Sequence, residues 1–151
     1  RRNGETRAAY AFHLTIGHHG YFSLMPVWLL SLPGMALGLM RLNDPDRRRR
    51  TWAMASLLCL LVSAAVFGFY LLKSDNYGGW CNGPRWLMWL APLWLIAMIP
   101  VLDTLSKSRV GAGLALALLA ASMMSMNYHS WSPWRHPWIY EWMDAKGWIN
   151  Y

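Results

Sequence analysis

Four long apolar stretches constrain this chain more than any other feature of its sequence. They cover residues 21–40, 51–72, 86–102 and 110–126, and none of them contains Asp, Glu, Lys or Arg. A helix of about 20 apolar residues crosses a hydrocarbon core about 30 Å thick, and about 17 residues is the lower limit. The sequence therefore predicts an all-α, multi-pass transmembrane bundle of about four spans.

The overall composition argues against a soluble domain. Hydrophobic residues make up 56% of the chain and charged residues 14%, whereas soluble domains carry about 25% charged residues. Buried helices of a soluble protein are the weaker alternative, because the last three stretches have no polar face. The net charge of +7 comes largely from loop arginines rather than from a basic recognition face, so no nucleic-acid partner is expected.

Prolines and small residues distinguish the individual stretches. Pro26 and Pro33 are expected to kink the first, and the third contains Pro92 and Pro100. The fourth is rich in Gly, Ala and Ser, which favours close packing against another helix. Two cysteines, at positions 59 and 81, would lie at different membrane depths, so no disulfide is expected.

The distribution of Lys and Arg predicts the orientation. The loop 41–50 holds five arginines and the loop 103–109 holds two basic residues, against four in the loop 73–85 and the tail together. Arg1, Arg2 and Arg7 of the N-terminal segment weaken this bias. Basic loops favour the cytoplasmic side. We therefore expect a cell (inner) membrane protein with an extracytoplasmic N-terminal segment 1–20 and an extracytoplasmic tail 127–151.

The first residue is Arg, and no signal peptide follows it. The chain is therefore expected to be a processed product or a fragment of a longer reading frame.

The tail is expected to form an interfacial helix. Trp134, Trp138 and Trp142 recur every four residues, Pro137 could open a helix and Gly147 could close it. Tryptophans on one helical face are typical of a helix lying at the lipid headgroups. The alternative is that some indoles stack on a sugar ring or cover a lipid-carrier groove.

A specific loop, "DNYGGWCNGPRW" at 75–86, separates the second and third stretches. Its dipeptides Gly78-Gly79 and Gly83-Pro84 predict two tight turns. These turns would bring Tyr77, Trp80 and Arg85 to the membrane edge. Arg85 would begin the third helix, where free N–H groups, the helix dipole and the guanidinium fork suit a phosphate. The alternative is an arginine that only snorkels to the interface.

Histidines gather in the N-terminal segment, which brings His13, His18 and His19 to the same side; the tail adds His129 and His136. Adjacent histidines would diverge on a helix, and no carboxylate stands at ligand spacing from His18 and His19, so no metal site is expected. These two could instead donate to a phosphate or a sugar hydroxyl, or serve only as capping or interfacial groups.

Two motifs resemble a known class of enzymes. "NYGGWCNGPRWLMWLAPLWLI" resembles the "GGxxxGPR" loop and following helix of bacterial polytopic glycosyltransferases of the GT-C type, relatives of the protein O-mannosyltransferases and the aminoarabinose transferases. "GHHGYFSLMPVWLLSLPGM" is similar to the "HGxFSxxP" start of a late membrane span in such families. The resemblance covers most of the chain, as the C-terminal membrane portion of a longer protein.

The resemblance implies transfer of a sugar from a polyprenyl-phosphate donor to an extracytoplasmic acceptor. The implied partners are the lipid bilayer, the polyprenyl-phosphate-linked sugar and an N-terminal remainder of the same protein, with no further cofactor. The catalytic carboxylate of those families lies in the first outward loop, so no catalytic residue of this chain is implied. The loop residues Gly78, Gly79, Gly83, Pro84 and Arg85 would line the cavity near the donor phosphate.

Two other functions stay open. A non-catalytic membrane subunit could bind a partner protein or a lipid through its Trp-rich outer face. A transporter or flippase is less favoured, because transporters usually carry ionisable residues inside their spans and these four stretches have none.

Overall fold

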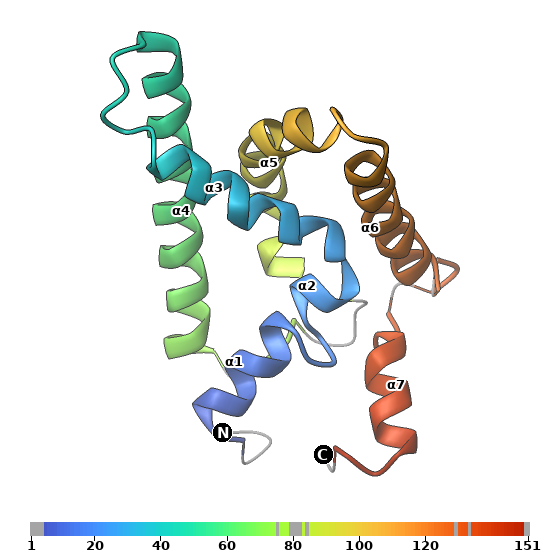
Figure 1. The fold of residues 1–151 in the computed structure, drawn as a ribbon. Coiled ribbons are helices and arrows are strands. Elements are labelled where there is room, and N and C mark those ends of the chain that lie inside the picture. The colour runs from blue at the N-terminus through green and yellow to red at the C-terminus, as the bar shows by residue number, and fades with distance from the viewer. Residues whose placement is uncertain are drawn as a thin grey trace.

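The computed structural model describes residues 5–74, 76–78, 83, 85–128, 130–132 and 134–149, and all regular structure in these ranges is helical (Figure 1). This confirms the expected all-α fold. The elements in chain order are α1 (Arg7–Thr15), α2 (Tyr21–Leu24), η1 (Pro26–Leu30), α3 (Ser31–Leu39), α4 (Arg47–Lys73), η2 (Arg85–Leu90), α5 (Ala91–Leu105), α6 (Arg109–Asn127) and α7 (Trp138–Ala145).

Three helices in the described ranges are long and apolar enough to cross a membrane. They are α4, the continuous helix Arg85–Leu105 formed by η2 and α5, and α6. They coincide with the second, third and fourth apolar stretches. At 27 residues, α4 is about 40 Å long. It begins before the apolar stretch because Asp46 caps it and the arginines 47–50 form its first turn. The Asp46 carboxylate accepts the Arg48 N–H at 2.9 Å.

The first apolar stretch is not one straight helix. It folds as α2, η1 and α3 in succession, and its longest apolar helical run is the shorter segment Pro26–Leu39. The break lies at Met25, whose φ and ψ are −130° and 74°, because a residue before proline is pushed out of the α region. Pro33 lies in the first turn of α3, where a missing N–H is tolerated, and causes no break.

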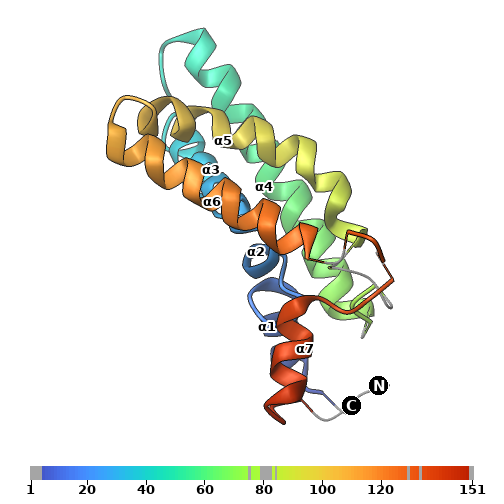
Figure 2. The ribbon, with the colours of Figure 1, turned by 90° about the vertical axis from the view of Figure 1, so that its right-hand side faces the viewer.

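The helices pack in a defined order around α5. It lies between α4 on one side and α6 on the other, and α3 packs across both α4 and α5 (Figures 1 and 2). Two glycines allow these close approaches. A Cβ on Gly34 would overlap the Ala97 carbonyl of α5, and a Cβ on Gly38 would overlap Ser56 of α4. Small residues at such contacts are typical of membrane helices.

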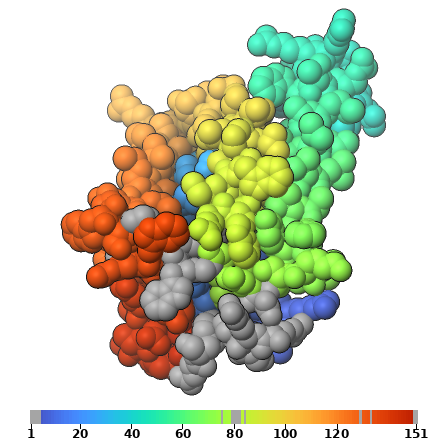
Figure 3. Space-filling view, turned by 180° about the vertical axis from the view of Figure 1, so that it is seen from behind, coloured from blue at the N-terminus to red at the C-terminus, as the bar shows by residue number. Residues whose placement is uncertain are grey.

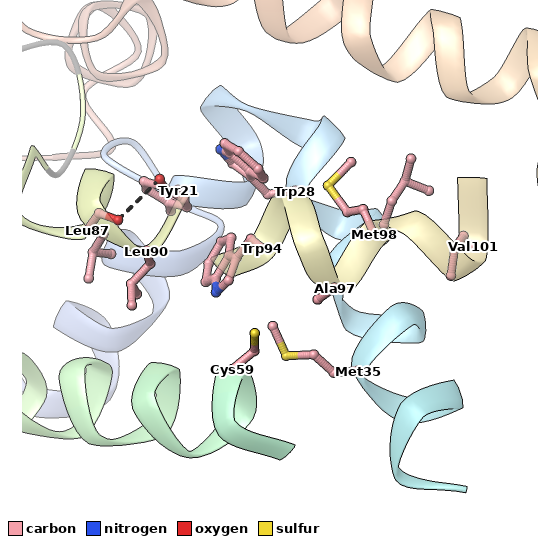
Figure 4. Packing of buried hydrophobic residues seen from close by; sticks show 11 residues of the cluster. Tyr21, Trp28, Met35, Cys59, Leu87, Leu90, Trp94, Ala97, Met98 and Val101 are labelled. Carbon is pink, nitrogen blue, oxygen red and sulfur yellow. Dashed lines mark hydrogen bonds between the residues drawn. The ribbon is translucent and has the colours of Figure 1, made fainter. Parts of the chain in front are cut away.

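The core centres on Trp94 of α5 (Figure 4). Its indole N–H donates to Ser63 Oγ of α4 at 2.8 Å, so its one polar atom is satisfied. Tyr21 lies edge-on to the indole ring, with centroids 5.1 Å apart, and its hydroxyl donates to the Leu87 carbonyl at 3.3 Å. The core thus joins α2, α4, η2 and α5.

The outer surfaces of α4, α5 and α6 are apolar. Figure 3 shows the three helices from behind, side by side. Large hydrophobic side chains are exposed on each of them, among them Leu61, Phe69, Leu95, Ile99, Leu116 and Met123. Such a surface suits contact with lipid rather than water.

The connecting segments divide between the two ends of the bundle. The Arg-rich turn before α4 and the turn between α5 and α6 lie at one end, and α1, α7 and both described chain ends lie at the other (Figures 1 and 2). Within the Arg-rich turn, Arg49 forms ion pairs with Asp44 at 3.6 Å and Asp46 at 3.7 Å.

Candidate functional site

A cluster of imidazole and phenol rings lies where α1, the segment after α4 and the tail meet. We call it the His–Tyr cluster, and its members are His13, His18, His19, Tyr77, His136 and Tyr140. Three segments far apart in the sequence supply it. His18 and His19 are almost completely buried within it.

A tight turn after α1 brings the first three histidines together. Gly17 N–H donates to the Phe12 carbonyl at 2.8 Å, and Gly20 N–H donates to the Gly17 carbonyl at 3.0 Å. A Cβ on Gly17 would overlap the His13 ring, so glycine at this position leaves room for that ring. His13 stacks on His18 with ring centroids 4.0 Å apart.

The prediction that His18 and His19 diverge is wrong. Both lie in the turn rather than on a helix, so their rings meet edge to face, with centroids 4.7 Å apart. Their Nδ1 atoms are in hydrogen-bond contact. The assumption of helical geometry failed because Gly17 and Gly20 flank the pair and close the turn.

The segment after α4 contributes Tyr77. Its ring stacks on His19 with centroids 4.9 Å apart, and its hydroxyl donates to Glu5 Oε2 at 2.6 Å. The segment is fixed by Tyr10, whose hydroxyl donates to the Asn76 carbonyl at 2.9 Å. The structure therefore brings together His18, His19 and Tyr77, three of the residues that the sequence singled out.

The glycines of this segment adopt the expected conformations where they are described. Gly78 and Gly83 both have φ of 106°, a region that favours glycine. The Gly78 N–H donates to the Asn76 side-chain carbonyl at 3.0 Å, which forms an Asx turn. Three other predicted residues, Gly79, Trp80 and Pro84, lie outside the described residues.

The tail supplies the remaining rings. His136 stacks on Tyr140 with centroids 4.1 Å apart, and it lies edge-on to His19 at 5.7 Å. The Trp138 indole N–H donates to Ser125 Oγ of α6 at 2.8 Å, which ties the tail to the bundle. Sequence reasoning gave Tyr140 no role, although its spacing of four residues from His136 is a signal that could have paired the two.

The tail helix differs in extent from the prediction. Pro137 is the N-cap and α7 begins at Trp138, so Trp138 and Trp142 lie on the helix and Trp134 precedes it. The predicted end is confirmed: Gly147 has φ of 68°, and its N–H donates to the Asp144 carbonyl at 2.8 Å while Trp148 N–H donates to the Met143 carbonyl at 3.0 Å. This is a Schellman cap.

The histidines are held in the neutral form. Burial, reinforced by repulsion from neighbouring imidazoles, lowers the pKa of His18 to about 2 and that of His19 to about 3. Burial also lowers the pKa of His13, against the opposing charge of Glu5, and the pKa of His136, against nearby tail carboxylates. A neutral imidazole offers one donor and one lone pair, so the cluster is rich in lone pairs near pH 7.

Two imidazole nitrogens of the cluster make no hydrogen bond within the described part of the chain. His13 Nδ1 and His19 Nε2 are buried and have no hydrogen-bond partner there. Buried polar atoms in native structures are usually paired. The cluster therefore has spare capacity to bind a polar group or an ion.

A carboxylate also stands beside the histidines. Donor atoms of Glu5, His13 and His18 all lie within 4.8 Å of one another. The sequence separates Glu5 from His18 by 13 positions, and the turn after α1 closes that distance. We expected no metal site because no carboxylate lies at ligand spacing in the sequence. The fold nevertheless brings the Glu5 carboxylate close to His13 and His18.

Arg85 stands at the start of η2, as predicted for the N-terminus of the third span. Its own N–H donates to the Gly83 carbonyl at 2.9 Å. The exposed guanidinium carbon lies 5.9 Å from the centroid of the Trp134 ring, within the range of a cation–π interaction. Contact of Arg85 with a phosphate stays a prediction.

Comparisons of this chain with protein-family models, with curated proteins and with solved structures found no match. The functional argument therefore rests on the geometry of the site and on the sequence patterns.

Proposed function

We propose that this chain is the C-terminal membrane portion of a glycosyltransferase that moves a sugar from a polyprenyl-phosphate donor to an extracytoplasmic acceptor. The observation that carries the proposal is the convergence of His18, His19 and Tyr77 in one polar cluster at one end of a bundle whose outer helix surfaces are apolar. A lipid-linked sugar has this same division, with a polar headgroup at the membrane surface and an apolar chain within it.

The proposed membrane arrangement has four spans. Three are α4, the η2–α5 helix and α6, and the fourth is the broken segment 21–39. The Arg-rich turn faces the cytoplasm of the cell membrane, in keeping with the bias of basic residues. The His–Tyr cluster and the tail face outward, and α7 lies at the headgroups with Trp142 about half exposed.

In the proposed reaction, some catalytic groups belong to this chain and others to the N-terminal remainder of the same protein. The reaction breaks the bond from the anomeric carbon to the donor phosphate oxygen and forms a bond to an acceptor oxygen. A base takes the acceptor proton, and the leaving phosphate keeps the electron pair and needs positive charge beside it. Arg85 would supply that charge, Trp134 an aromatic face, and the outward loop outside this chain the base.

Replacing Arg85 with alanine should weaken binding of the donor lipid. A hydrogen bond to a charged group contributes about 1.5–3 kcal/mol, so the dissociation constant of polyprenyl phosphate should rise about 10- to 150-fold. The measurement is lipid binding to the full-length protein in detergent. Arg50→Ala, at the opposite end of the bundle, is the matched control and should bind like the wild type. Equal binding by Arg85→Ala and the wild type would contradict the assignment of Arg85 to the donor phosphate.

The second candidate is a non-catalytic membrane subunit that binds a partner through its tryptophans. The exposure of Trp131 (85%), Trp134 (66%) and Trp148 (63%) favours it, because large apolar side chains left exposed are typical of interaction surfaces. The same experiment separates the two functions. A wild-type protein that does not bind polyprenyl phosphate at all would favour the subunit.

A further inference from the structure

We propose that Glu5, His13 and His18 form a binding site for a divalent first-row transition metal of the zinc class. The site lies at the N-terminal edge of the His–Tyr cluster. The inference goes beyond the proposed transferase function and does not depend on it.

The donor set is the first support. Two imidazoles and one carboxylate are a known ligand set for Zn²⁺, with a fourth position left open, and also for Fe²⁺. Ligand atoms at about 2.0–2.1 Å from a tetrahedral ion lie about 3.3 Å apart. The donor atoms here are within 4.8 Å of one another, so rotations of the Glu5 and His13 side chains bring them to coordination distance.

The surroundings of the three donors are the second support. Tyr77 donates its hydroxyl hydrogen to Glu5 Oε2 at 2.6 Å, and such a bond orients a ligating carboxylate. His19 contacts His18 through Nδ1 and holds that ring in place. Gly17 leaves the space that the His13 ring occupies. Glu5 and His18 thus each have a neighbour that orients the donor group, and His13 has room for its ring.

The third support is that the site is open on one side and that His13 is not committed to a partner through Nδ1. The buried Nδ1 of His13 has no hydrogen-bond partner in the described ranges. His18 is fully buried, whereas Glu5 and His13 are partly exposed. An ion can therefore approach from the solvent side and bind against His18.

The test uses the full-length protein in detergent, stripped of metal with a chelator and titrated with Co²⁺. We expect visible d–d absorption that reaches a plateau and is removed by Zn²⁺. Glu5→Gln and His13→Gln should each weaken Co²⁺ binding at least 10-fold. The matched control is His136→Gln, which alters a ring of the same cluster outside the proposed ligands and should bind like the wild type.

A second measurement keeps the test decisive if a variant folds poorly. At one Zn²⁺ concentration, Zn²⁺ should raise the Tm of the wild type and of His136→Gln, and should raise the Tm of Glu5→Gln by less, because a conservative change of this partly exposed side chain weakens binding. Three results would overturn the site: no Co²⁺ absorption and no Zn²⁺ effect on the wild-type Tm, unchanged binding in both ligand variants, or loss of binding in His136→Gln alone. Elemental analysis of the purified protein would distinguish zinc from iron.

Discussion

Trp94→Ala should be the most destabilising single substitution in the bundle, with a loss of about 3–5 kcal/mol in the free energy of unfolding. Trp94 is 1% exposed. Its ring stacks on Phe22 at 5.4 Å and Phe67 at 6.1 Å, and it bonds to Ser63. Alanine would leave a cavity where α2, α4 and α5 meet and would strip Ser63 of its indole partner.

The measurement is thermal unfolding of the detergent-solubilised protein. At about 2–4 °C per kcal/mol, the Tm should fall by about 6–20 °C. Trp89→Ala is the matched control, because Trp89 lies five residues earlier in the same continuous helix and is 65% exposed; it should change the free energy of unfolding by no more than about 0.5 kcal/mol. A Trp94→Ala protein that melts with the wild type would refute this account of the core.

Gly34→Ala should destabilise the protein although alanine is the better helix former. The added Cβ would overlap the Ala97 carbonyl, and a backbone atom cannot rotate away as a side chain can. Separating α3 from α5 should cost about 1–3 kcal/mol, which outweighs the gain of about 1 kcal/mol in helix propensity.

The control for Gly34 is a glycine of α6. A Cβ on Gly113 meets nothing within 4 Å, so Gly113→Ala should leave the Tm unchanged or raise it slightly through the same gain in propensity. The two variants make the same chemical change within a helix. If both shift the Tm in the same direction by similar amounts, the close packing of α3 on α5 is not what limits stability.

The sequence predicts the positions of the long helices well because their apolar stretches are evident from hydropathy. The predicted spans 51–72, 86–102 and 110–126 fall within Arg47–Lys73, Arg85–Leu105 and Arg109–Asn127. The observed helices are longer because hydropathy marks only the apolar part, whereas caps such as Asp46 and Ser108 decide where a helix begins.

The first stretch was harder to predict. Pro26 and Pro33 look alike in the sequence, but only the bond before Pro26 falls where the chain leaves the helix. Packing helps to decide between them: the Val27 N–H, close to the start of η1, donates to Ser122 Oγ of α6 at 3.0 Å. No local pattern reveals a partner 95 residues away.

The site was predictable only in part for the same reason. Glycines and aromatic residues marked Tyr77 and its neighbours as special, and the histidine pair was conspicuous. Glu5 gained significance only through the turn at Gly17, which folds His18 back toward the start of α1. A spacing rule along one helix could not find this arrangement, because its donors come from both ends of α1.

Two serines of α6 connect the bundle to the His–Tyr cluster. Ser122 accepts the Val27 N–H and Ser125 accepts the Trp138 indole N–H at 2.8 Å, so α6 is tied both to the segment that follows His18 and His19 and to the helix that carries Tyr140. Because α6 is also the candidate span with the smallest buried share, it is the one most open to its lipid surroundings. A lateral displacement of α6 would therefore strain both borders of the cluster at once.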